Sequence, residues 1–161
     1  MEKLWAPWRM EYVSSGEKRE ECIFCLEELQ EEDEKRYVLY RTTHSFVMMN
    51  IYPYNNGHLM VAPYQHVSCL TSLDDEILAD LFQTVRCSVG ILKKVYGPEG
   101  FNTGINTGSA GGAGYEKHLH VHVVPRWNGD CNFMPVLADT KVLPEHLSST
   151  FQKLKKAFSE L

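Results

Sequence analysis

Residues 118–127 read HLHVHVVPRW and place histidine at every second position of an otherwise apolar run. Valine favours pleated strands, and successive side chains of a strand point to opposite faces of the sheet. The strand is therefore expected to present its histidines on one face and apolar side chains on the other. The histidines are His118, His120 and His122, and the opposite face carries Leu119, Val121 and Val123. The apolar face predicts a core, while the histidine face offers nucleophiles, metal ligands or proton carriers.

Length and composition predict one globular domain. At 161 residues, about 70% of the surface of the unfolded chain can be buried. Hydrophobic residues at 43% and charged residues at 23% are ordinary globular usage, which argues against disorder, coiled coils and membrane proteins. The formal net charge of -5 disfavours nucleic acid as a partner, although a local cationic pocket for a small phosphorylated ligand remains compatible with it.

The five cysteines do not form the pattern of a disulfide framework, because their number is odd and only Cys22 and Cys25 are close together. The N-terminal MEKLWAPWRMEYV lacks the apolar segment of a signal peptide, so we expect a cytoplasmic protein with reduced thiols and no membrane partner. The Cys-x-x-Cys pair can bind zinc with two imidazoles; a redox pair and two unconnected thiols are the alternatives. Candidate imidazoles are His44, His58, His66 and one histidine of residues 118–122.

The remaining strand patterns predict an antiparallel sheet. Residues 37–50 have the pattern of two strands broken at Thr42 and Thr43, and residues 57–63 that of a third strand after the turn YPYNNG. FNTGINTG, residues 101–108, predicts a polar strand, and SAGGAG, residues 109–114, predicts a loop before the histidine strand. The fold class that fits best is α+β, with an antiparallel sheet.

Two segments have the apolar spacing of helices. The first runs from Ser72 or Asp74 to Tyr96, with acids at its start, lysines near its end, and Gly97 and Pro98 as a stop. Its apolar residues are Ile77, Leu78, Leu81, Phe82, Val85, Val89 and Leu92. The second lies in the tail 144–161, with Leu147, Phe151, Leu154, Phe158 and Leu161 on one stripe. We expect a single domain over 1–161, with an N-terminal arm (1–21), a core (22–127) and a C-terminal extension with a helix (128–161).

The glycine-rich segment NTGSAGGAGYEKH, residues 106–118, matches neither a Walker loop nor a dinucleotide fingerprint. Small residues beside a histidine row let backbone N–H groups approach a phosphate closely. A plain connection between two strands is the alternative interpretation.

Together, these motifs resemble the histidine triad family of nucleotide hydrolases and transferases. HLHVHVVPRW is similar to the family's His-x-His-x-His-x-x signature, and the resemblance extends to CIFC (22–25), GHLMVAPYQH (57–66) and the glycine loop. The flanking LWAPWRMEYV (4–13) and PRWNGDCNFMPV (125–136) further resemble the branch described as diadenosine tetraphosphate phosphorylases.

The resemblance implies a set of roles. His120, the middle histidine, would be the nucleophile, and the family's structural zinc ion would be held by four residues: Cys22, Cys25, His66 and His118. His58 and His122 would face the reacting phosphate, and Asn50 would contact ribose. Asn106, Gly114 and Tyr115 fall in the loop that holds phosphate oxygens. A homodimer is also implied.

The function that the resemblance implies is cleavage of dinucleoside polyphosphates through a covalent nucleotidyl-histidine, which inorganic phosphate or water would resolve. A nucleoside phosphoramidate hydrolase and a non-catalytic, zinc-stabilised nucleotide-binding module are the alternatives. A hexose-phosphate uridylyltransferase is disfavoured, because that branch resembles His-Pro-His-x-Gln and the last position here is His122.

Overall fold

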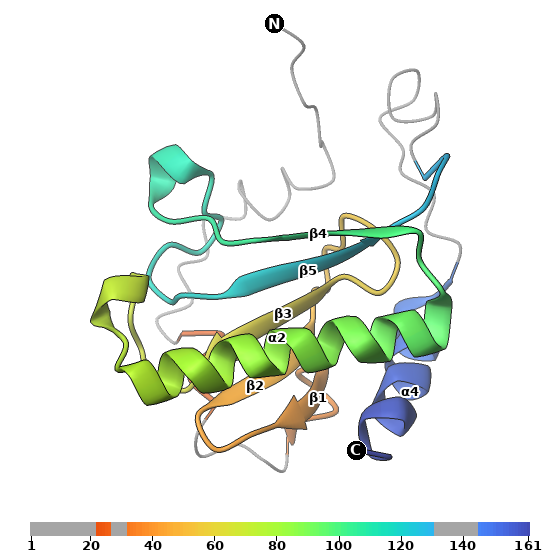
Figure 1. Cartoon of the computed structure of the whole chain (residues 1–161), viewed down its shortest axis with the longest axis horizontal. Coiled ribbons are helices and arrows are strands. Elements are labelled where there is room, and N and C mark those ends of the chain that lie inside the picture. Colours follow the sequence, from red (N-terminus) through yellow and green to blue (C-terminus); the bar gives the residue numbers. More distant parts are fainter. Residues whose placement is uncertain (1–21, 27–31, 131–144) are drawn as a thin grey trace, which may run out of the picture.

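The computed structural model describes residues 22–26, 32–130 and 145–161 (Figure 1). The expected N-terminal arm and the second half of PRWNGDCNFMPV, residues 131–136, lie outside the described residues. The described elements are, in order, β1 (Val38–Arg41), β2 (Ser45–Met49), β3 (Leu59–Pro63), a 3₁₀ turn (Leu70–Ser72), α2 (Asp75–Tyr96), β4 (Gly100–Gly104), a second 3₁₀ turn (Ser109–Gly111), β5 (Val121–Arg126) and α4 (Leu147–Phe158). None of the described helices combines the length and apolarity needed to cross a membrane.

The strands form one sheet in the order β1-β2-β3-β5-β4, and every neighbouring pair is antiparallel. The first three strands are the expected meander, broken between β1 and β2 at residues 42–44. β5 lies between β3 and β4, so that His122 is paired with Met60 on one side and Gly104 on the other. The α+β prediction with an antiparallel sheet is confirmed.

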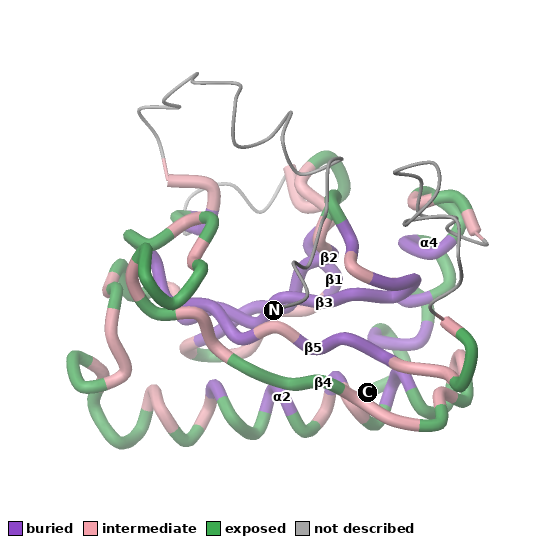
Figure 2. Tube along the Cα trace, turned by 90° about the horizontal axis from the view of Figure 1, so that it is seen from above, coloured by how far each residue is buried: buried purple, intermediate pink, exposed green. Residues whose placement is uncertain are grey.

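The two faces of the sheet have different coverings. α2 and α4 lie on one face, where the larger apolar cluster includes Leu119, Val121 and Val123 of the histidine stretch. Figure 2 shows α2 running along the sheet, exposed on its outer side and buried toward the strands. Met60, the partner of His122, belongs to the second cluster, which covers the opposite face and contains Phe24. The predicted alternation of apolar and histidine faces is therefore confirmed, with the histidines on the face away from the helices.

The strand begins later than expected. β5 starts at Val121, so His118 and His120 precede it. The reason is that the N–H of Leu119 donates to the carbonyl of Val67 (2.6 Å), in the segment after β3, and not to a neighbouring strand.

α2 has the ends that the sequence predicts, with Asp74 as the N-cap and Gly97 as a left-handed C-cap (φ 55°). One residue of the apolar list is on the surface, since Phe82 is 46% exposed while its neighbour Leu81 is fully buried. Successive residues of a helix are about 100° apart, which turns Phe82 out of the buried stripe. The C-terminal helix also ends earlier than its stripe: Leu161 lies beyond Phe158 and is 65% exposed.

A polar network joins both helices to the turn before β3. The Glu145 carboxylate accepts hydrogen bonds from Tyr96 (2.8 Å), Thr150 (2.8 Å) and Lys153, and the Thr150 hydroxyl also contacts Asn56 Oδ1 (3.1 Å). Burial by itself would raise the pKa of Glu145, but these donors outweigh burial and lower the pKa to about 2.

We expect Glu145→Gln to reduce the free energy of unfolding at pH 7 by about 2 kcal/mol, because a charged acceptor is lost. The pKa is depressed in the folded state, so the contribution is present above the ordinary carboxylate pKa and fades as the pH falls from there toward 2. Urea unfolding across this range measures it. Glu160→Gln, which breaks an exposed pair with Lys94, is the control and should cost less; equal losses in the two variants would contradict the network's role.

Candidate active site and metal-binding group

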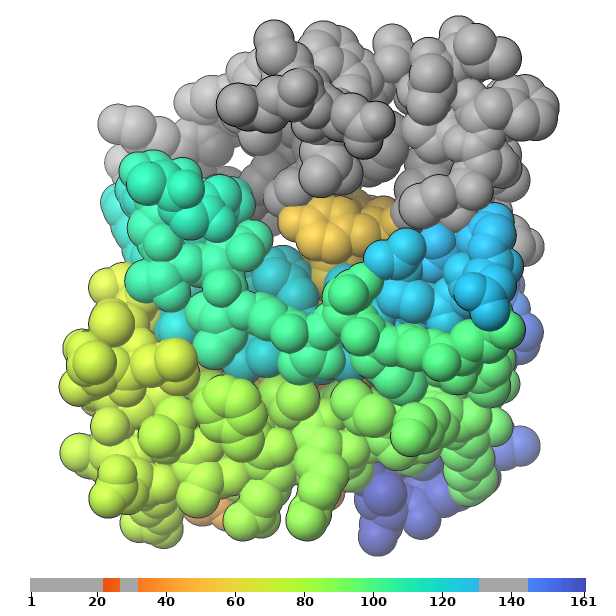
Figure 3. Space-filling model, turned by 45° about the horizontal axis from the view of Figure 1, so that its top comes forward, coloured from red at the N-terminus to blue at the C-terminus, as the bar shows by residue number. Residues whose placement is uncertain are grey.

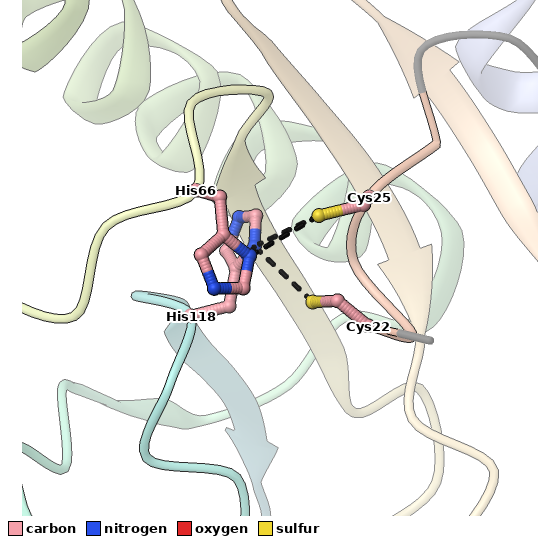
Figure 4. A group of neighbouring side chains, drawn as sticks. All are labelled: Cys22, Cys25, His66 and His118. Carbon is pink, nitrogen blue, oxygen red and sulfur yellow. Dashed lines mark hydrogen bonds between the residues drawn. The ribbon is translucent and has the colours of Figure 1, made fainter. Parts of the chain in front are cut away.

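Four potential metal ligands converge from three distant segments. Cys22 and Cys25 precede β1, His66 follows β3, and His118 precedes β5 (Figure 4). Their ligand atoms all lie within 4.8 Å of one another. The Sγ of Cys22 is 3.4 Å from His118 Nδ1, the Sγ of Cys25 is 3.2 Å from His66 Nδ1, and the two Nδ1 atoms are 3.3 Å apart.

These distances fit one tetrahedral ion. With zinc–sulfur bonds of about 2.3 Å and zinc–nitrogen bonds of about 2.05 Å, tetrahedral ligands are separated by about 3.6 Å (sulfur to nitrogen) and about 3.3 Å (nitrogen to nitrogen). His118 Nε2 lies 2.8 Å from the Pro63 carbonyl and donates to it, which leaves the Nδ1 lone pair facing the group. Burial lowers the pKa of His118 to about 4 and keeps this lone pair available. The group can therefore bind a metal ion.

His120 is held in one tautomer. Its Nδ1 lies 2.8 Å from the carbonyl oxygen of His118, so Nδ1 carries the proton and donates it. The lone pair of the neutral ring is then on Nε2. His120 is 5% exposed, and burial lowers its pKa, which favours the neutral ring. A neutral imidazole with a fixed Nδ1–H is a competent nucleophile at Nε2.

The tautomers of His58 and His122 follow from one backbone donor. The N–H of Tyr54 donates to His58 Nδ1 (3.0 Å), so the proton of the neutral His58 ring is on Nε2. His58 Nε2 is 3.0 Å from His122 Nδ1 and donates to it, which leaves the proton of His122 on Nε2. These tautomers are assigned from the hydrogen-bond network. The Nε2 atom of His120 thus carries a lone pair, whereas the Nε2 atom of His122 carries a proton.

The turn that carries His58 is anchored on both sides. Asn55 Nδ2 donates to the Pro125 carbonyl (3.0 Å) and to Asp130 (2.7 Å), which lie at and after the end of β5. Gly57 has φ 74°, and a Cβ there would be 3.2 Å from Leu92 Cδ2. The turn therefore requires glycine for its conformation and for the close approach to α2.

Only some of the residues expected to contact substrate lie beside the histidines. Asn50 lies beside His58 (3.4 Å between Nδ2 and Nδ1), and its Oδ1 accepts from the Tyr52 N–H (2.9 Å). Tyr115 reaches the histidine face through an edge contact with Phe24 (5.7 Å). Asn106 bonds within the glycine loop, to the Gly112 carbonyl (3.4 Å), and Gly114 is exposed. Among the described residues, neither makes a hydrogen bond to the histidines.

Figure 3 shows how distant segments meet at this face: gold atoms from the region around residue 50 emerge between the cyan loop after β4 and the blue residues at the end of β5. Sequence reasoning missed several supporting residues here, namely Phe24, Tyr54, Asn55 and Asp130. The turn pattern YPYNNG marks Tyr54 and Asn55 as turn residues without naming their partners. Nothing in the sequence pairs Asn55 with Asp130.

Fold and site together define an antiparallel α+β domain with a histidine row beside a Cys/His group, and a model of the HIT domain matches residues 31–129. The chain belongs to the HIT family. It is 38% identical over 157 residues to the AP-4-A phosphorylase of Mycobacterium tuberculosis, covering 93% of this chain and 80% of that protein. It is 37% identical over 93 residues to the asymmetrical bis(5'-nucleosyl)-tetraphosphatase of Schizosaccharomyces pombe, covering 58% of this chain and 50% of that protein.

Among solved structures, the fold is similar to that of a hypothetical histidine triad nucleotide-binding protein from Sulfolobus tokodaii. The TM-score is 0.65 at 26% identity, and the match covers 86% of this chain and 90% of that one. The similarity to this structure therefore extends over most of the chain.

Proposed function

We propose that this protein is a HIT enzyme that cleaves dinucleoside polyphosphates such as diadenosine tetraphosphate. The observation that carries the proposal is the 38% identity to the AP-4-A phosphorylase over nearly the whole chain, combined with a nucleophilic tautomer at His120. Asn50 would contact the ribose. Asn106, Gly114 and Tyr115 would meet the phosphate oxygens, which requires the glycine loop to approach the histidines when substrate binds.

In the first step, the Nε2 lone pair of His120 attacks the α-phosphorus of diadenosine tetraphosphate in line with the leaving oxygen. A P–N bond forms, the P–O bond breaks, and ATP leaves with the electron pair. His122, whose Nε2 carries a proton, would donate a hydrogen bond to the phosphoryl or leaving oxygen, and His58 would hold His122 in that tautomer. The product on the enzyme is adenylyl-His120.

In the second step, an oxygen of inorganic phosphate attacks the same phosphorus and the P–N bond breaks. The electron pair returns to Nε2 of His120, and ADP is released. A bound phosphate gains the effective molarity of a positioned nucleophile, whereas water needs no site and competes unless the pocket excludes it.

We further propose that the metal is zinc and that its role is structural. Two thiolates and two imidazoles are a donor set that zinc favours. When bound, zinc would link the Cys22–Cys25 segment to His66 and His118. Four protein ligands leave no position for substrate or water, so no step of the reaction passes through the ion.

With diadenosine tetraphosphate and inorganic phosphate, we expect ADP and ATP as products, measured by chromatography. Without phosphate, the adenylyl group stays on His120 or is released slowly as AMP. Release of AMP plus ATP in both conditions, with no phosphate-dependent ADP, would make the protein a hydrolase. That second candidate is favoured by the similarity to the tetraphosphatase.

A parallel incubation with adenosine phosphoramidate tests the remaining alternatives. Faster turnover of the phosphoramidate would identify a phosphoramidate hydrolase, and turnover of neither substrate would identify a binding module.

The partners and location proposed are a homodimer in the cytoplasm. β4 is an edge strand whose residues Asn102, Thr103 and Gly104 are exposed, so its ladder can pair with a second copy. Phe82 presents an apolar ring on the outer side of α2. Cys22, Cys69 and Cys87 do not take part in disulfides, and thiols stay reduced in this way in the cytoplasm.

A further inference from the structure

The ring of Phe24 connects the metal-binding group to the histidine face. Phe24 stands between the two cysteines in sequence and is 1% exposed. Its ring is stacked on the imidazole of His120, with centroids 4.6 Å apart and an interplanar angle of 21°. It also contacts His118 (5.3 Å) and Tyr115 (5.7 Å). One side chain therefore touches the proposed nucleophile, a metal ligand and the glycine-loop side of the site.

The orientation of His120 depends on this contact. The hydrogen bond from Nδ1 to the His118 carbonyl fixes where one edge of the ring lies, but it leaves the ring able to tilt about that bond. Phe24 packs against one face of the ring, and His122 makes a perpendicular contact with it (4.8 Å, 78°). These contacts together set the plane of the imidazole and hence the direction of the Nε2 lone pair. In-line attack is sensitive to that direction.

The position of Phe24 depends in turn on its neighbours in sequence. The Cys25 N–H donates to the Cys22 carbonyl (3.2 Å), so residues 22–25 form a tight turn. Both thiols of this turn point toward the imidazoles of His66 and His118 (Figure 4). A metal ion bound by both sulfurs fixes the two ends of this turn, and Phe24 lies between those ends. Phe24 also belongs to the second apolar cluster, together with Phe46, Met48 and Met60 of the sheet.

We propose that Phe24 is a positioning residue through which metal binding at Cys22 and Cys25 sets the orientation of His120. The metal is then structural for the fold and also tunes the reactivity of the nucleophile, without taking part in the reaction. The role of His120 in this inference rests on the proposed function; the physical coupling between metal and imidazole does not.

The kinetic test uses the metal-loaded protein. We expect Phe24→Leu, which keeps apolar volume but removes the flat ring, to lower kcat at least about tenfold with KM changed less than about threefold. Phe24→Tyr keeps the ring and should restore kcat to within about threefold of the parent. Ile23→Val is the matched control in the same turn, since Ile23 packs against the second cluster, and its kcat should match the parent.

Zinc content and melting temperature are measured for each variant, because lost metal or lost folding would lower kcat for another reason. A Phe24→Leu protein with full zinc, a melting temperature equal to that of Ile23→Val and an unchanged kcat would overturn the proposal.

The second readout is independent of activity. In protein with ¹⁵N-labelled histidine, we expect replacement of zinc by cadmium, whose bonds to sulfur are longer, to shift the ring signals of His120. The shift should be much smaller in Phe24→Leu. An equal shift in both proteins would mean that coupling runs through the His118 backbone instead of Phe24, and would overturn the proposal. The two proposals can fail separately. If His120→Ala remained active, the proposed function would be wrong, but a His120 ring shift that is present in the parent and lost in Phe24→Leu would still support the coupling.

Discussion

His120→Ala is expected to lower kcat at least about a thousandfold, which corresponds to about 4 kcal/mol of lost transition-state stabilisation. The reason is that no described side chain other than His120 combines a neutral imidazole, a fixed Nδ1–H and a lone pair at Nε2 on this face. His122 and His58 are held in the tautomer with the proton on Nε2, so neither can take over the attack without rearranging the hydrogen-bond chain that begins at the Tyr54 N–H.

The fold should survive this substitution. The neighbouring residues Leu119, Val121 and Val123 pack on the helix side of the sheet, away from the imidazole, and are untouched. A cavity under the Phe24 ring will lower the melting temperature modestly. Near-parent circular dichroism together with lost turnover separates chemistry from folding.

Two further measurements make the test specific. Added imidazole should partly restore turnover to His120→Ala, because it can occupy the vacated space and carry the adenylyl group. His44→Ala is the control: its ring pairs with exposed Glu76, and its kcat should equal that of the parent. Turnover of His120→Ala within about tenfold of the parent, a difference of only about 1.4 kcal/mol, would show that His120 is not the nucleophile.

The sequence predicts local structure here better than long-range contacts. The alternation of residues 118–123 predicts which side chains face the helices, because a period of two leaves no other arrangement on a pleated strand. It does not predict that Leu119 bonds to Val67, which makes β5 begin at Val121. Similarly, the helical stripe predicts α2 but not the exposure of Phe82, since a stripe has edges that only the packed sheet defines.

The site, like the fold, has features that the sequence predicts and contacts that it does not. Spacing alone predicts that Cys22 and Cys25 can share a metal, but it leaves six histidines as candidates for the other two ligands, and only the family resemblance selects His66 and His118. The fold brings the resemblance-derived ligands together within 4.8 Å. The stacking of Phe24 on His120 joins residues that are distant in sequence, and no local pattern encodes it. Such contacts depend on how the folded sheet places two segments that lie outside its strands, since Phe24 precedes β1 and His120 precedes β5.

Loss of the metal is expected to have the second large effect, a fall in the stability of the fold. Protein purified without chelator is expected to contain about one zinc per chain, and Cys25→Ser should lose most of it, because a neutral hydroxyl replaces a thiolate ligand. A bound ion at about a thousand times its dissociation constant stabilises the folded state by about 4 kcal/mol. For a chain of this size, such a loss corresponds to a fall in melting temperature of about 8 to 16 °C. Metal analysis and thermal unfolding measure the two quantities.

The control is Cys69→Ser, a thiol beside Thr71 (3.1 Å) that does not belong to the metal-binding group. It should keep both zinc and melting temperature. Stoichiometric zinc in His118→Ala would mean that the fourth ligand is a different residue.

Loss of the metal should not unfold the whole chain, because a second set of contacts holds the cysteine segment to the sheet. Arg41 forms a two-pronged ion pair with Asp33 (2.7 and 3.0 Å) and donates to the Leu26 carbonyl (3.3 Å), one residue after Cys25. We therefore expect Cys25→Ser to remain folded at 25 °C. Combining Cys25→Ser with Arg41→Ala should destabilise the protein by more than the sum of the two single changes. The reason is that either the metal or the Arg41 contacts can hold the cysteine segment to the sheet when the other is lost.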